Sequence, residues 1–260
     1  MPFESIMYDK YNRTGLITLN RPKVFNALNA QCREELHKAI DDAAGDKNIG
    51  ALIITGHEKF FCAGADINDV MDFKSAADAI KFSRNFHRLF QKIEELGKPV
   101  IAAVSGFALG GGCELAISCD VRILSESASF GLSEIDIGAF PAGGGTQKLP
   151  RLIGSARAKE MLFTGERISA QDAYNIGIAT RVVPDGECLN EARKWAEKVA
   201  SKSPSAIAAI KSLVNTGINM DLNSALVFES ETFGALSTRN DFKEGMSAFL
   251  EKRKPVYKGD

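Results

Sequence analysis

The stretch FALGGGCELA, residues 107–116, places three consecutive glycines directly before Glu114 and a run of small apolar residues. Glycine loses more backbone entropy on folding than any other residue, so three in succession indicate a tight turn or a close approach to bare backbone. The preceding segment KPVIAAVSG (98–106) predicts a buried strand. The glycines therefore either turn backbone N–H groups toward a ligand oxygen or permit tight helix packing, and the residues alone favour neither.

Two further glycine-bearing loops, CAGAD (62–66) and FPAGGGTQ (140–147), lie on either side of this one in the chain. We expect each of the three loops to lie at a strand-to-helix junction, where the first turn of the helix offers free N–H groups and a positive dipole end. Two such ends that converge on one point would form an oxyanion hole from backbone alone.

Two glutamates occupy apolar surroundings near these loops. Glu114 falls in the first turn of an otherwise apolar helix, and Glu134 lies in SFGLSEIDIG (129–138). Burial raises the pKa of a carboxyl group and suits it to proton transfer. The alternative is that both glutamates cap helices or face solvent. Asp136 is a third candidate.

The composition is that of an ordinary water-soluble protein with one large folded unit. The chain has 260 residues, 45% of them hydrophobic and 25% charged, and a formal net charge of −1, which disfavours nucleic-acid binding. Its five cysteines form no C-x-x-C pair and predict reduced thiols in a cytoplasmic protein. We find no signal peptide, transit peptide or stretch long enough to span a membrane.

The order of predicted elements indicates an α/β core with crossovers. Asn29 is expected to cap a helix that runs through Ile40, and residues 76–95 show helical spacing of apolar side chains. After Pro141 we expect mainly helices. The predicted strands are FESIMYDK (3–10), GLITLN (15–20), GALIITG (50–56), KPVIAAVSG (98–106) and DVRILS (120–125), of which the first two should form a hairpin.

Several common catalytic signatures are absent from the sequence. There is no G-x-S-x-G elbow and no G-K-[ST] after the glycines, and Leu115 stands where G-x-G-x-x-G needs its third glycine. His37, His57 and His87 are scattered, and no cluster has metal-ligand spacing.

Five segments of the sequence, which are spread over essentially the whole chain in the family's order, resemble the enoyl-CoA hydratase/isomerase (crotonase) family. The resemblance implies an α/β crotonase (ClpP-like) fold, in which a spiral of ββα units over residues 1–200 precedes a C-terminal helical oligomerisation region. This region, residues 201–260, is expected to form trimers and not to be an independent domain. The segments are NRPKVFNALN (20–29), FCAGADI (61–67), KPVIAAVSGFALGGGCELAISCD (98–120), SFGLSEIDIGAFPAGGGTQKLPRLIG (129–154) and EGMSAFLEKRK (244–254).

The resemblance also implies a reaction and a site. The backbone N–H groups of Ala65 and Gly111 match the family's oxyanion hole for a thioester carbonyl, and Glu114 and Glu134 match its two catalytic glutamates. Family members that keep both glutamates usually hydrate a trans-2-enoyl-CoA to a 3-hydroxyacyl-CoA. No metal or redox cofactor is expected, because coenzyme A arrives as part of the substrate. Further substrate-binding positions implied by the resemblance are Val24, Ala27, Ala63, Asp66, Ile67, Asn68, Ala142, Phe249 and Lys252.

Phe249 and Lys252 match a C-terminal helix of the family that can reach the CoA site of a neighbouring subunit. The resemblance therefore implies homotrimers or hexamers made of two trimers. Two short segments depart from the family pattern: Leu132-Ser133 replaces Gln-Pro, and Pro141-Ala142-Gly143 replaces Pro-Gly-Ala. We expect the Ala142 N–H to hold the reacting water. Candidates for the acyl pocket are Met71, Phe86 and Phe140.

Three alternatives accompany this interpretation. An isomerase of the family needs only the second glutamate, and a ring-hydrating enzyme would use the same scaffold. The third is an RNA-binding relative. It is disfavoured because the helix over residues 29–48 has a net acidic face, on which Arg33, Lys38 and Lys47 are outnumbered by Glu34, Glu35, Asp41, Asp42 and Asp46.

Overall fold

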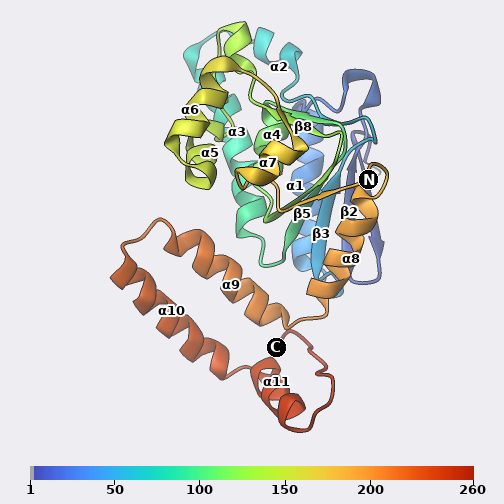
Figure 1. Ribbon diagram of the computed structural model, residues 1–260, viewed down its shortest axis with the longest axis vertical. Coiled ribbons are helices and arrows are strands. Elements are labelled where there is room, and N and C mark those ends of the chain that lie inside the picture. Colours follow the sequence, from blue (N-terminus) through green and yellow to red (C-terminus); the bar gives the residue numbers. More distant parts are fainter. Residues whose placement is uncertain (1–2) are drawn as a thin grey trace.

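A six-stranded sheet forms the centre of the computed structural model, which describes residues 3–260 (Figure 1). The predicted hairpin pairs antiparallel at one edge, and every other neighbouring pair of strands is parallel. In sheet order the strands are β1 (Ile6–Tyr11), β2 (Thr14–Leu19), β3 (Ala51–Thr55), β5 (Val100–Val104), β7 (Val121–Ser125) and β10 (Arg181–Val183).

A second, four-stranded sheet is made of very short strands that the sequence analysis did not predict. Because β3, β5 and β7 of the large sheet are each followed by a strand of the small sheet and then by helix, the chain winds as a spiral of ββα units. In sheet order the short strands are β4 (Phe60–Cys62), β6 (Phe107–Leu109), β8 (Ser129–Gly131) and β9 (Ile168–Ser169).

The long helices match the sequence expectations closely. The Asn29 side chain accepts a hydrogen bond from the Cys32 N–H, as expected of a helix cap, but the helix continues to Gly45 instead of ending at Ile40. The helix predicted over residues 76–95 has these same bounds. The helices that begin before residue 160 are α1 (Ala30–Gly45), α2 (Ile67–Met71), α3 (Ala76–Glu95), α4 (Gly111–Ile117), α5 (Gly145–Ile153), α6 (Ser155–Thr164), and the 3-10 helices η1 (Pro22–Val24) and η2 (Glu134–Ile137).

Both faces of the large sheet are buried, and the alternation of side chains along each strand divides them between two cores. Leu52 and Ile54 face the larger core, which the helices on the side of α1 and α3 cover. Ile53 points to the other face and packs against α8 (Cys188–Ala200). That helix approaches the strands closely because small residues recur every fourth position along it: Cys188, Ala192, Ala196 and Ala200.

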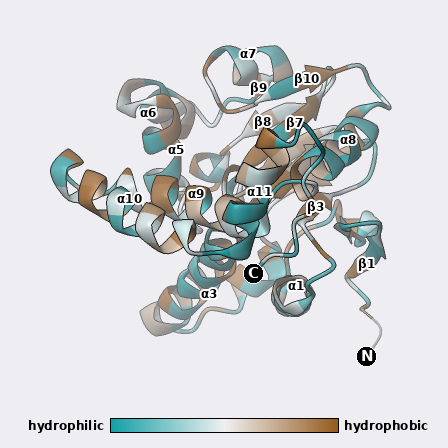
Figure 2. Cartoon of the chain, turned by 90° about the horizontal axis from the view of Figure 1, so that it is seen from below, coloured by the Kyte–Doolittle hydropathy of each residue, from teal (hydrophilic) through white to brown (hydrophobic). Residues whose placement is uncertain are grey.

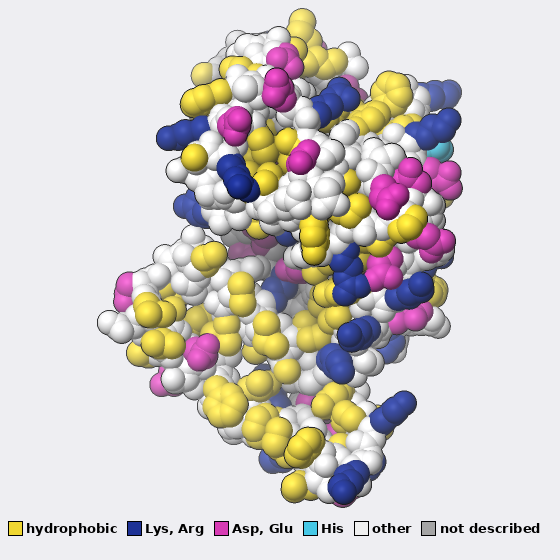
Figure 3. All heavy atoms as spheres, viewed as in Figure 1, with side chains coloured by type: hydrophobic (Ala, Val, Ile, Leu, Met, Phe, Trp, Pro, Cys, Tyr) yellow, Lys and Arg dark blue, Asp and Glu magenta, His cyan; other side chains and the backbone are white. Residues whose placement is uncertain are grey.

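The last three helices project from the core as an arm, drawn in orange to red in Figure 1. Figure 2 shows hydrophobic and hydrophilic residues side by side along this arm, and Figure 3 shows apolar side chains gathered on its surface. Phe249 is 82% exposed, and large apolar residues on all three helices are similarly exposed. The remaining helices are α7 (Ala170–Asn175), α9 (Pro204–Gly217), α10 (Leu222–Ser237) and α11 (Asn240–Leu250).

One sequence expectation about the later part of the chain was wrong, and another was confirmed. The loop FPAGGGTQ (140–147) follows the 3-10 helix η2 instead of a strand, because β8 already ends at Gly131. The region after Pro141 is mainly helical, as expected, and two short strands in it, β9 and β10, each form an edge of one sheet. Within residues 3–260 no helix is long and apolar enough to cross a membrane.

Candidate active site

The three glycines that precede Glu114 meet three separate physical demands. Gly110 has a φ of 49°, and a Cβ placed there would lie 2.8 Å from Glu134 Oε1. Gly112 packs so closely that its Cβ would lie 2.4 Å from the carbonyl oxygen of Cys62. Gly111 is the first residue of α4, where its N–H has no partner within the helix. Tight packing and a backbone N–H without a partner therefore coexist in one turn.

The N–H groups of Ala65 and Gly111 lie on adjacent loops. The amide nitrogen of Ala65 is 3.1 Å from the position that a Cβ would take on Gly111. Within residues 3–260 neither N–H has a hydrogen-bond acceptor. The loop that carries Ala65 is held by the segment before α1, because the Leu28 N–H donates to the Gly64 carbonyl at 2.8 Å. Two free donors on a rigid backbone are the elements of an oxyanion hole.

Glu114 is buried, and its carboxylate is held by the third glycine-bearing loop. Oε1 accepts hydrogen bonds from the N–H groups of Gly143 at 2.9 Å and Gly145 at 2.7 Å. Burial raises the pKa of Glu114 to about 7, and the nearby charge of Glu134 adds to this effect. The two N–H donors and the ammonium group of Lys148 oppose the rise without cancelling it. A carboxyl group with this pKa exchanges protons readily near neutral pH.

Glu134, the first residue of η2, is the second carboxylate of the site. Its Oε1 lies beside Gly110, and its Oε2 is buried without a hydrogen-bond partner in the described part of the chain. Burial raises the pKa of Glu134 and favours its protonated form. Asp136, the third candidate from the sequence, is exposed near Gly165 and does not line the cavity that the two glutamates share.

A cavity of about 790 Å³ connects these groups. Both glutamates line it, and most of its remaining wall is apolar. Phe86 and Phe140 line it as predicted, but Met71 does not, because its side chain is 79% exposed on the outer side of α2. The apolar part of the wall comprises Ala63, Ala65, Ile67, Val70, Phe73, Ala79, Ile80, Phe82, Phe86, Ile137, Ala139, Phe140 and Ala142.

The other predicted binding positions fall into two groups. Val24, Ala27, Asp66 and Asn68 do not line the cavity, and Asp66 instead pairs with Arg21 at 2.9 Å and accepts a hydrogen bond from the Asn68 N–H. Phe249 and Lys252 belong to the α11 end of the arm, far from the cavity within one chain (Figure 1).

The sequence departs from the family pattern at positions 132 and 133, directly before Glu134, and at position 142, in the third loop. Leu132 is buried in the core, whereas Ser133 and Ala142 line the cavity. The Ala142 N–H has no acceptor within residues 3–260, so it is free to bind a ligand or water. Sequence reasoning missed Ser83 of α3, which also lines the cavity and has no motif around it.

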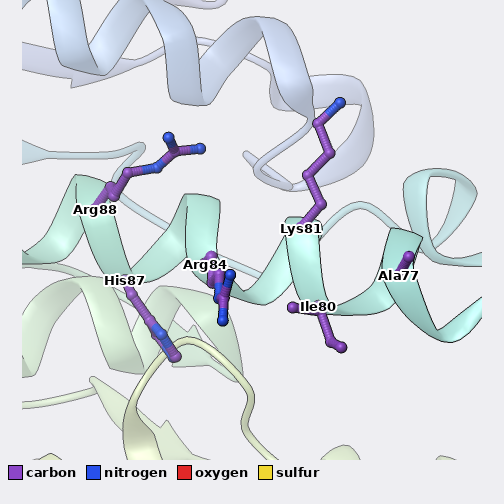
Figure 4. A pocket seen from close by; sticks show the side chains of 6 residues that line it. All are labelled: Ala77, Ile80, Lys81, Arg84, His87 and Arg88. Carbon is purple, nitrogen blue, oxygen red and sulfur yellow. The ribbon is translucent and has the colours of Figure 1, made fainter.

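A basic groove of about 630 Å³ runs along α3 next to the cavity (Figure 4). Ile80 and Arg84 line both the groove and the cavity. The groove is lined by Ala77, Ile80, Lys81, Arg84, His87 and Arg88. Within residues 3–260 no group of three or more His, Cys, Asp or Glu side chains could hold a metal ion.

A buried and a partly buried carboxyl group beside two free backbone N–H groups, on one largely apolar cavity, are the parts of an enzyme that moves protons next to a polarised carbonyl. The chain belongs to the enoyl-CoA hydratase/isomerase family, whose sequence model matches residues 9–260. It is 42% identical to the short-chain-enoyl-CoA hydratase of Clostridium acetobutylicum over 98% of this chain and 97% of that protein.

Two further relatives support the same conclusion. The crotonyl-CoA hydratase of Syntrophomonas wolfei is 43% identical over 98% of both chains. The crystal structure of an enoyl-CoA hydratase from Bacillus anthracis superimposes with a TM-score of 0.94 and is 40% identical, covering 99% of this chain and all of that one. The crotonase fold expected from the sequence is therefore confirmed.

Proposed function

We propose that this protein is an enoyl-CoA hydratase, a hydro-lyase that reversibly adds water to a trans-2-enoyl-CoA and gives a 3-hydroxyacyl-CoA. The observation that carries the proposal is that the buried Glu114 and the partly buried Glu134 line one cavity with the free N–H groups of Ala65 and Gly111. Hydration needs two proton-transfer groups, whereas an isomerase needs one shuttle. The hydratase names of full-length relatives at 42–43% identity support the same choice.

The proposed reaction uses the two glutamates in opposite protonation states. Glu114, which accepts two N–H hydrogen bonds, acts as the carboxylate and takes a proton from water as the water oxygen bonds to Cβ. The π electrons move toward the thioester oxygen, where the N–H groups of Ala65 and Gly111 stabilise the negative charge. Glu134, whose buried Oε2 lacks a partner, donates its proton to Cα and completes the addition. No metal or redox cofactor is needed in this scheme.

The proposed binding mode places the acyl chain in the apolar cavity between α2, α3 and the loop after η2. The loop of residues 65–68, with Val24 and Ala27 beside it, would contact the CoA moiety. We also propose that residues 201–260 form the trimer interface and that Phe249 and Lys252 reach a neighbour's CoA site. Support comes from the exposed apolar side chains of α9–α11, which water would otherwise cover (Figure 3). The five unpaired cysteines support a cytoplasmic location.

The decisive test is turnover of a series of enoyl-CoA thioesters. Crotonyl-CoA, longer trans-2-enoyl-CoAs, a cyclic enoyl-CoA and a 3-enoyl-CoA would be incubated with the enzyme, and the products identified by mass spectrometry. We expect a gain of one water on at least one trans-2-enoyl-CoA. A shifted double bond without water uptake would favour the isomerase, and no reaction with any thioester would overturn the proposal.

A further inference from the structure

Ser83 of α3 connects two parts of the site that are 59 residues apart in the chain. Its hydroxyl donates a 2.7 Å hydrogen bond to the carbonyl oxygen of Ala142. This carbonyl belongs to the peptide group whose N–H, on Gly143, donates to Glu114 Oε1 at 2.9 Å. One rigid peptide plane is therefore held at both ends, by Ser83 on one side and by the carboxylate on the other.

We infer that Ser83 is a positioning residue for the reaction: it fixes the orientation of the 142–143 peptide and, through it, the Glu114 carboxylate. The inference rests on the proposed hydratase function. A peptide plane moves as a unit, so rotation that breaks the Ser83 contact also turns the Gly143 N–H away from Glu114. The same rotation displaces the Ala142 N–H only indirectly, because that N–H belongs to the preceding peptide.

The surroundings of Ser83 fit this role. Its Oγ lies 3.4 Å from Nε2 of His87, one turn further along α3. Since the Ser83 hydrogen is used on the Ala142 carbonyl, His87 serves as the donor in this contact. Figure 4 shows the His87 side chain pointing from α3 toward a neighbouring loop, and His87 lines a surface hollow together with Gly143 and Gly144.

The charged and titratable groups around the chain of contacts are few. Glu134 on η2 and Lys148 on α5 act on Glu114, and Cys113 of α4 lies beside it. On α3 only His87 contacts Ser83. Loss of the Ser83 hydroxyl leaves all four groups in place, so a change in the titration of Glu114 would report on the peptide between Ala142 and Gly143.

The test compares Ser83→Ala with wild type on the best enoyl-CoA substrate, with Ser83→Thr as the conservative variant. A hydrogen bond from an N–H favours the charged carboxylate, so a weaker bond raises the pKa of Glu114. We expect kcat to fall about 3–10-fold, KM to stay within about twofold, and the acid limb of kcat/KM to move up by roughly 0.3–0.8 pH unit. Ser83→Thr should recover most of the rate and the wild-type limb.

Ser201→Ala is the matched control, because the Ser201 hydroxyl donates only to the Lys198 carbonyl at the end of its own helix, α8. It should behave as wild type. If Ser83→Ala does not fold, Ser83→Cys keeps the size, weakens the donor and reports on the same limb. A folded variant with wild-type kcat and an unmoved limb would overturn the inference. So would a rise in KM alone, which would make Ser83 a substrate contact. An inactive wild type would instead reject the proposed function.

Discussion

The backbone N–H of Gly145 donates to Oε1 of Glu114 across 2.7 Å, which joins the first residue of α5 to the first turn of α4. The bond stabilises the charged carboxylate, yet burial outweighs it and leaves the pKa at about 7 instead of the ordinary 4.5. Ionised Glu114 therefore lowers the free energy of unfolding, and this effect grows as the pH rises.

Glu114→Gln should stabilise the protein more at pH 8 than at pH 5. The folded pKa lies above the unfolded one, so the contribution of Glu114 to stability is greatest below about 4.5 and declines as the pH rises through about 7. The full effect corresponds to roughly 3 kcal/mol. The amide oxygen of Gln can still accept from Gly143 and Gly145. Urea unfolding at both pH values measures the difference, and a variant equally stabilised at both would contradict it.

Gly143→Ala should lower kcat about 10²-fold while the fold is kept. A Cβ at this position would lie 2.5 Å from Glu114 Oε2 and 2.9 Å from the Phe90 ring, so the carboxylate must move. Displacements of about 1 Å cost on this order in rate. Gly45→Ala is the control, since a Cβ at Gly45 meets nothing within 4 Å. Steady-state kinetics and circular dichroism of both variants test this, and a fully active Gly143→Ala would disprove it.

Gly111→Pro should lower kcat by ~10²–10³, the usual effect of losing one oxyanion donor. Proline suits the first position of a helix, where Gly111 stands, so the substitution removes the N–H there, while its Cβ, 3.1 Å from the Ala65 nitrogen, also crowds the second donor. Circular dichroism would confirm folding before the rate of hydration is measured. Near-normal turnover in a folded variant would exclude Gly111 from the oxyanion hole.

The sequence predicted elements whose pattern is long enough to read. The 76–95 helix and the strand KPVIAAVSG were identified because many apolar residues repeat the helical or buried-strand pattern. The strands β4, β6 and β8 have three residues each, too few to distinguish from loop. The Ser83–Ala142 contact had no local signal, because it depends on how α3 packs against a loop 59 residues away.

The candidate site likewise has residues that the sequence identifies and contacts that it does not. Glu114 and Glu134 could be selected because a charge among apolar residues is conspicuous in any sequence. The glycines of FPAGGGTQ were conspicuous too, but the direction of their N–H groups was not, and Gly143 and Gly145 proved to hold Glu114. Met71 was a candidate for the acyl pocket, but in α2 its side chain is 79% exposed.

Lys211→Met should destabilise the chain by about 1–3 kcal/mol and loosen the arm at α9. The buried ammonium group donates to Asp120 Oδ2 at 2.7 Å and to the carbonyls of Ile93 and Lys98. Methionine keeps the stem but removes the donor from all three acceptors, and Asp120 Oδ2 then keeps only the Val100 N–H, at 2.7 Å. Urea unfolding and hydrogen exchange of α9 measure the effect, with Lys202→Met as an exposed control. Unchanged exchange in α9 would show that the arm is held by other contacts.

The two glutamates give the sharpest distinction between hydratase and isomerase. If both transfer protons, Glu114→Gln and Glu134→Gln should each lower hydration of crotonyl-CoA by ~10²–10⁴. The double variant should lose less than the product of the two effects, because the groups act together on one addition. Both amides keep the size of the side chain, so affinity for a saturated acyl-CoA should change little.

In an isomerase the two single variants would differ: Glu134→Gln is inactive, and Glu114→Gln still moves the double bond of a 3-enoyl-CoA. Loss of the conjugated thioester absorbance follows hydration in all four proteins, and full hydration by either single variant would refute the two-carboxylate mechanism.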